Sequence, residues 1–141
     1  MKVILQDNNQ YVLRFDKGET VLQGVADFMT AQNIFACTFT GLGTCSNVEL
    51  GFFNSHLKDY RKKPFLEDLE ITSLIGNGSI FASDNKPTVH AHGSFSRTDF
   101  TVVAGHVFEI VTLATCEIHL TKLEGKMQRS KKEDFNLSLL D

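Results

Sequence analysis

The sequence predicts an α+β fold, in which a mainly antiparallel β-sheet carries one principal helix packed on it. Most of the chain alternates apolar and polar residues with the period of two that is typical of half-buried strands. Only residues 19–33 show helical spacing instead. The strand-like runs follow one another without a regular strand–helix–strand alternation, and this order favours antiparallel pairing.

The length and composition predict one globular domain. A chain of 141 residues can bury a substantial core, so we expect a single domain over residues 1–141, with a charged C-terminal tail over about 126–141. Twelve Phe and no Trp make Phe the main large core residue. No run approaches the ~20 apolar residues of a membrane span. The N-terminus turns polar too soon for a signal peptide, and we therefore expect a cytoplasmic protein.

The first third of the chain is expected to form a hairpin, the helix and an interrupted strand. Strands are predicted at residues 2–6 and 10–16, joined by a turn. The apolar face of the helix consists of five residues at helical spacing, Val21, Leu22, Val25, Phe28 and Met29. A strand over 34–40 should meet a turn or a bulge with positive φ at Gly41-Leu42-Gly43, and a strand should resume over 45–53.

The remainder is expected to be almost entirely β-structure. Residues 54–63 are polar and basic, and no strand is predicted there. A strand is predicted over 65–80, with a break or bulge at Gly76-Asn77-Gly78. After a turn at 84–87 comes a histidine-rich strand, and a long strand is predicted over 112–123.

Three of the five histidines, His90, His92 and His106, lie within seventeen positions. Residues i and i+2 of a strand share a face, so His90 and His92 should point the same way. A second strand-like run follows over 100–107. If the two runs form a hairpin centred on Thr98, His106 pairs with His90 and all three imidazoles share one face. A shift of the centre by half a residue would send His106 to the opposite face.

Three imidazoles on one face suit a divalent transition metal, zinc above all. Three protein nitrogens with a fourth position left for water form the open type of zinc site. The alternative interpretation is that two of the three are ordinary polar surface residues on a half-exposed sheet. His56 and His119 lie outside this geometry, and we exclude them as ligands.

Several acidic residues stand among apolar neighbours in predicted strands. Either Glu49, Glu70 and Glu117 face solvent or pair with a nearby Lys or Arg, or at least one of them lines the histidine pocket. For a metal-dependent reaction a general base would be needed, and Glu117, Glu70 and Asp99 are the candidates.

The net charge of −3 counts against a protein that binds nucleic acid mainly through phosphates. Two basic clusters exist, each flanked by acids, and we interpret both as solvated surface. They consist of Lys58, Arg61, Lys62 and Lys63, and of Lys126, Arg129, Lys131 and Lys132. The three cysteines lack CxxC spacing and lie in apolar surroundings, so Cys37, Cys45 and Cys116 are predicted to be buried free thiols.

Several motifs occur in an order that resembles a known family. They are Thr40-Gly41-Leu42-Gly43-Thr44, Val48-Glu49-Leu50-Gly51-Phe52-Phe53, Leu69-Glu70-Ile71-Thr72-Ser73-Leu74-Ile75-Gly76, His90-Ala91-His92, Ala104-Gly105-His106 and Thr115-Cys116-Glu117-Ile118. With the helix after Gly18-Glu19, this order resembles the PPC domain, the plants-and-prokaryotes conserved domain. The resemblance extends from about residue 2 to about residue 124.

The resemblance implies an α+β fold that assembles as a homotrimer. It also implies a histidine cluster that holds a metal in some bacterial and archaeal members, and His90, His92 and His106 match that cluster by position. The partner-binding motif of plant members corresponds here to residues 67–72, of which only the Glu70-Ile71 pair matches. The AT-hook core Arg-Gly-Arg-Pro is absent.

Three functions follow from these observations. The first is a trimeric PPC-domain module, associated with DNA or regulation, with a histidine metal or ligand site. The second is a zinc-dependent enzyme of hydrolase or lyase type. The third is a small-molecule sensor that uses the same pocket.

Overall fold

The computed structural model describes residues 1–141 and contains one α-helix and nine β-strands. All the strands belong to one sheet, which confirms the α+β prediction. The strands are β1 (Lys2–Asp7), β2 (Gln10–Asp16), β3 (Cys37–Asn54), β4 (Asp59–Phe65), β5 (Leu69–Phe81), β6 (Pro87–Ser96), β7 (Val102–Lys122), β8 (Gln128–Lys132) and β9 (Leu137–Leu140), and the helix is α1 (Val21–Ala31).

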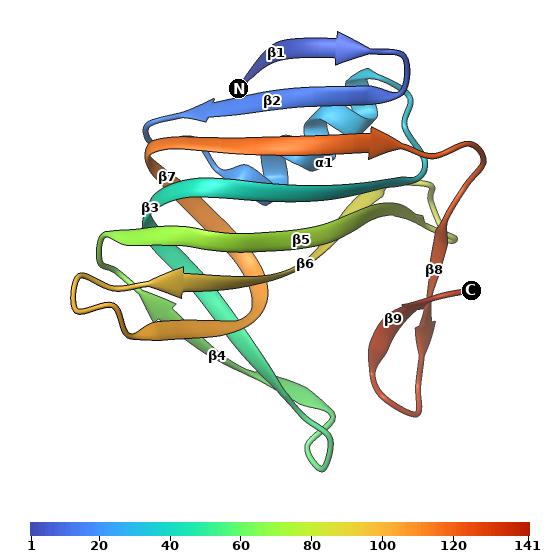
Figure 1. Ribbon diagram of the computed structural model, residues 1–141. Coiled ribbons are helices and arrows are strands. Elements are labelled where there is room, and N and C mark those ends of the chain that lie inside the picture. The colour runs from blue at the N-terminus through green and yellow to red at the C-terminus, as the bar shows by residue number, and fades with distance from the viewer.

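Four strands pair in a closed ring, which curls the sheet around the core (Figure 1). In this ring β3 pairs with β5 and β7, and β6 pairs with β5 and β7, always antiparallel. The C-terminal part of β7 also pairs with β2, and the C-terminal part of β3 also pairs with β4. From Ala91 to Ser96, β6 has a partner on each side, whereas its first residues, including His90, pair with β5 alone.

The helix α1 covers the core-facing side of β6 and β7, and its apolar face is the predicted one. Its N-terminus is held by a side chain far away in the sequence. The Glu109 carboxylate of β7 accepts hydrogen bonds from the backbone N–H of Leu22 at 2.8 Å and of Gln23 at 3.1 Å. Thr20 makes no side-chain cap. Asn33 has φ 51° and ends the helical segment.

Of the turn or bulge expected at Gly41-Leu42-Gly43, the structure has the bulge with positive φ. β3 runs without interruption from Cys37 to Asn54, and its register with β5 shifts between Gly41 and Gly43. Gly43 has φ 143°, and a Cβ there would lie 2.2 Å from the Thr115 carbonyl oxygen. A glycine is required at this point because the neighbouring strand backbone occupies the space of a side chain.

Neither the break nor the bulge expected at Gly76-Asn77-Gly78 is present. The pairing of β5 with β3 is regular there, and the glycines are needed for packing. A Cβ on Gly78 would lie 2.3 Å from Met29 Sδ. The bulge of β5 lies earlier, between Ile71 and Ser73, and it turns Leu74 into the core.

Two further segments differ from the sequence prediction. Residues 59–65 form β4, although their polar, basic composition predicted no strand, because β4 pairs with only β3 and leaves most of its side chains in solvent. The two strands expected over 100–107 and 112–123 are one continuous strand, β7. The C-terminal tail forms the hairpin β8–β9, which joins β5 through parallel pairing of β8 (Figure 1).

The three cysteines are free and buried, as predicted. No helix has the length and apolar character that crossing a bilayer requires.

Candidate metal centre

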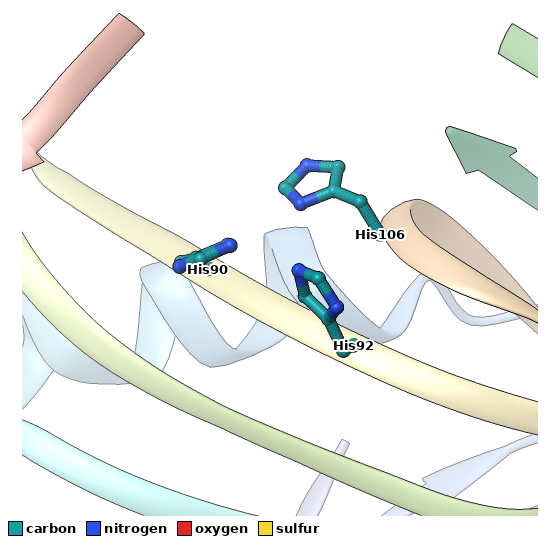
Figure 2. Close-up of side chains that lie close together, drawn as sticks. All are labelled: His90, His92 and His106. Atoms are coloured by element: carbon teal, nitrogen blue, oxygen red, sulfur yellow. The ribbon is translucent and has the colours of Figure 1, made fainter. Parts of the chain in front are cut away.

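Three imidazoles meet on the outward face of the β6–β7 pair. His90 and His92 project from β6, and His106 projects towards them from β7 (Figure 2). One potential ligand atom from each residue lies within 4.8 Å of the others. The ring centroids are 5.1 Å apart for His90–His92 and His90–His106, and 5.5 Å apart for His92–His106. On the opposite face of β6, Ala91 and Phe95 are buried in the core.

The predicted hairpin register is wrong by one pair, although the predicted face is correct. His106 pairs with His92 and not with His90, and Gly93 pairs with Gly105. The hairpin centre is therefore Asp99, one full residue beyond the expected centre. Because side chains alternate with a period of two, this shift preserves the face on which His106 lies.

Aromatic residues surround the His106 ring on its β4 side. The ring centroids of Tyr60 and Phe108 each lie 4.7 Å from that of His106. Lys62 Nζ lies 3.8 Å from the centroid of Phe108 and 3.9 Å from a carboxylate oxygen of Glu49. The Nδ1 atom of His106 is buried and has no hydrogen-bond partner. This ring nitrogen is therefore a polar atom for which the folded chain supplies no partner.

A buried arginine borders the histidines, and sequence reasoning missed it. Arg129 of β8 was interpreted as solvated surface, but only 8% of it is exposed. Its guanidinium hydrogen-bonds Ser79 Oγ at 2.9 Å and Asn77 Oδ1 at 2.9 Å, and its Nη2 lies 3.5 Å from His90 Nδ1. No local signal distinguishes this Arg from its exposed neighbour Lys131, since its burial depends on the pairing of β8 with β5.

The surroundings favour neutral imidazoles. Burial lowers the pKa of His106 to about 4, and the nearby His90, His92, Lys62 and Arg129 add to the effect. Burial also lowers the pKa of His90, with contributions from Arg129 and His92. Neutral rings are the form that binds metal ions, so proton competition at these two rings is weak near pH 7.

Comparison with known families and structures identifies the chain. The family model of the Plants and Prokaryotes Conserved (PCC) domain matches residues 4–124. The chain belongs to this family. The resemblance inferred from the sequence motifs is therefore confirmed.

Solved structures similar to this PCC-domain chain include a plant- and prokaryote-conserved (PPC) protein from Pyrococcus horikoshii. It is 31% identical with a TM-score of 0.88, and the alignment covers 100% of this chain and 97% of that one. A metal-containing protein from Archaeoglobus fulgidus is 30% identical, with a TM-score of 0.87 and 99% of each chain covered. A "putative DNA binding protein" from Bacteroides thetaiotaomicron has a TM-score of 0.91 at 24% identity, covering 97% of this chain and 94% of that one. At that identity the likeness shows the fold alone. Among curated proteins, no match is found.

None of the four carboxylates considered from the sequence belongs to the histidine group of the PCC domain. Glu49 pairs with Lys62, and Glu70 is exposed on β5 opposite Thr44. Glu117 lies on the far half of β7, opposite Arg14. Asp99 is in the hairpin loop, where it accepts hydrogen bonds from the backbone N–H and hydroxyl group of Thr101.

The donor set matches the chemistry of a divalent transition metal. Imidazole nitrogen is a preferred ligand of zinc and its neighbours, and three such nitrogens leave room for an external ligand. The unpartnered Nδ1 of His106 is a specific observation in favour of such a use. A bound ion would supply Lewis-acid polarisation of an oxygen atom.

Proposed function

We propose that this chain is a PCC-domain module of regulatory type that holds one divalent metal ion, zinc above all, on His90, His92 and His106. The observation that carries the proposal is the convergence of three ligand atoms within 4.8 Å on one strand pair. The metal-containing relative from Archaeoglobus fulgidus supports it. The three ligands come from two hydrogen-bonded strands, so the scaffold holds them without a flexible loop.

Zinc titration and elemental analysis test this proposal. Wild type should bind one equivalent of zinc, and His90→Ala, His92→Ala and His106→Ala should each weaken binding. His56→Ala is the matched control, because His56 lies in an exposed turn. At a free zinc concentration of about 100 times Kd, the free energy of unfolding should rise by about 2.7 kcal/mol. For a chain of this size, that is a Tm increase of roughly 8–10 °C. Unchanged binding in the triple variant would exclude the site.

We also propose that the protein is a homotrimer. Large apolar side chains remain exposed on the single chain, among them Leu42, Phe52, Phe100 and Val102. Self-association would cover such residues. Light scattering should give three times the 15.8 kDa chain mass. A stable monomer at micromolar concentration contradicts this part of the proposal.

Association with DNA is the second candidate function. It is supported by exposed basic residues on and beside the edge strand β4, namely Lys58, Arg61 and Lys63. The net charge of −3 opposes it. Binding to duplex DNA should weaken steeply with salt if these residues contact phosphates. No retardation of duplex DNA at low salt rules out direct binding.

A zinc-dependent enzyme remains the alternative, and the structure offers it less support. Hydrolytic chemistry at an open zinc site normally uses a general base. No carboxylate belongs to the histidine group. We therefore limit the proposal to binding.

A further inference from the structure

Arg129 carries a buried positive charge for which the chain provides no counter-ion. It donates three hydrogen bonds to neutral oxygens, from Nε to Ser79 Oγ at 2.9 Å, from Nη1 to the Ser138 carbonyl at 3.0 Å and from Nη2 to Asn77 Oδ1 at 2.9 Å. None of the ion pairs in the protein includes Arg129. A buried charge is costly unless an opposite charge compensates it. An anion from outside the chain would compensate this charge.

The guanidinium of Arg129 also has unused hydrogen-bond donors, which an external anion would occupy. Arginine has five N–H donors, and three of them are used at normal distances. Of the two that remain, one belongs to Nη1. The other belongs to Nη2, which lies 3.5 Å from His90 Nδ1, at the limit for a hydrogen bond. Two spare donors on one guanidinium match the two oxygens of a carboxylate.

Metal binding would break the long contact between Arg129 Nη2 and His90 Nδ1. A neutral imidazole has a single nitrogen lone pair, and arginine can only donate. If His90 gives that lone pair to a metal ion, its ring can no longer accept from Arg129. The Nη2–H then needs another acceptor beside the ion. This step rests on the proposed metal site, whereas the uncompensated charge of Arg129 does not.

The space beside the histidines fits a small ligand. Asn77 and His90, both in contact with Arg129, line a groove of about 290 Å³ together with Ile75, Gly76 and His92. An adjoining groove of about 420 Å³ shares Ile75 and His92 and is otherwise lined by small residues, Ser73, Gly93, Ser94, Ala104 and Gly105. Volumes in this range suit a small organic molecule. Ile75 is 57% exposed and offers an apolar surface to the non-polar part of such a ligand.

We propose that the histidine site takes a small organic carboxylate, whose carboxylate group is bound by Arg129 beside the metal ion and whose remainder lies over Ile75. A carboxylate fits better than a phosphate dianion. A phosphate needs more donors than the two spare N–H groups, and the other nearby cation, Lys62, is already paired with Glu49. In this arrangement Arg129 is a ligand-binding residue supplied by the C-terminal hairpin β8–β9.

The test is titration of metal-free and zinc-loaded protein with sodium acetate and with inorganic phosphate, at constant ionic strength set with chloride. Calorimetry and thermal shift give the affinities. Zinc-loaded wild type should bind acetate at least tenfold more tightly than metal-free protein, and Arg129→Gln should weaken acetate binding at least tenfold while zinc remains bound. Lys131→Gln, the matched control, removes a charge from the exposed part of the same strand and should leave both affinities unchanged.

The outcomes separate this proposal from that of the metal site. If zinc does not bind but metal-free protein binds acetate through Arg129, the carboxylate site stands and the metal site falls. If zinc binds but Arg129→Gln takes up acetate like wild type, the carboxylate site is wrong. Phosphate binding tighter than acetate also overturns the carboxylate assignment.

A second measurement on wild type covers the case in which Arg129→Gln fails to fold, because Arg129 also anchors β8. Nuclear Overhauser effects from ¹³C-labelled acetate to the Ile75 methyl groups and the His90 ring support the site. Effects confined to other residues, or none, refute it.

Discussion

His106 should make the folding of the metal-free protein sensitive to acid. Burial, reinforced by His90, His92, Lys62 and Arg129, lowers the pKa of this ring from its ordinary 6.5 to about 4. Below pH 6.5 the unfolded chain takes up a proton on the ring, whereas the folded chain does so only near pH 4. The contribution of the neutral ring to stability is therefore complete above about pH 6.5 and is lost as the pH falls towards 4.

The magnitude follows from the size of the pKa change. A gap of about 2.5 pKa units, at about 1.36 kcal/mol per unit, corresponds to roughly 3.4 kcal/mol. The His106 ring is only partly buried, so solvent screening reduces this value. We expect His106 to account for a loss of about 1.5–2 kcal/mol in the free energy of unfolding between pH 7 and pH 4.

Urea denaturation in the presence of EDTA measures this effect at pH 7.0, 5.5 and 4.5. Carboxylates elsewhere also titrate in this range, so the informative quantity is the difference between wild type and His106→Gln. The variant should lose less stability than wild type on acidification, even though it starts lower because it lacks the ring contacts with Tyr60 and Phe108. His56→Gln, in an exposed turn, should behave like wild type. Equal acid losses in wild type and His106→Gln would refute the reasoning.

Three further predictions concern packing, thiols and carboxylates. Gly78→Ala should lower the free energy of unfolding by about 1–3 kcal/mol, because its Cβ would lie 2.3 Å from Met29 Sδ; an unchanged urea midpoint contradicts this. Burial raises the pKa of three thiols, to about 11 for Cys37 and about 12 for Cys45 and Cys116. A thiol reagent such as DTNB should therefore label none of the three at pH 8 until urea unfolds the chain, and rapid labelling of native protein would show that one is accessible. Glu70→Gln and Glu117→Gln should keep the zinc affinity within about twofold of wild type, since neither belongs to the histidine group; a larger loss of affinity would place one of them in the site.

The local pattern of the sequence determined the helix and most of the strands, and which neighbouring side chains share a face. Strand alternation predicted that His90 and His92 share a face, and the helical spacing from Val21 to Met29 predicted the buried side of α1. These properties depend on residues two to four positions apart, so they can be predicted from the sequence alone. The actual partner of His106 is two positions from the predicted one, and such a shift leaves the side chain on the predicted face.

Tertiary structure alone decided which distant residues meet. The pairing of β8 with β5 buries Arg129 beside His90, and the carboxylate of Glu109 holds the start of α1 eighty-seven positions away. The glycines that looked like turns instead lie within strands, because neighbouring side chains and backbone fill the space of a Cβ. Whether a glycine bends a chain or accommodates a neighbour, and whether an arginine is solvated or buried, depends on partners far away in the sequence. Those partners are known only when the strands are paired in three dimensions.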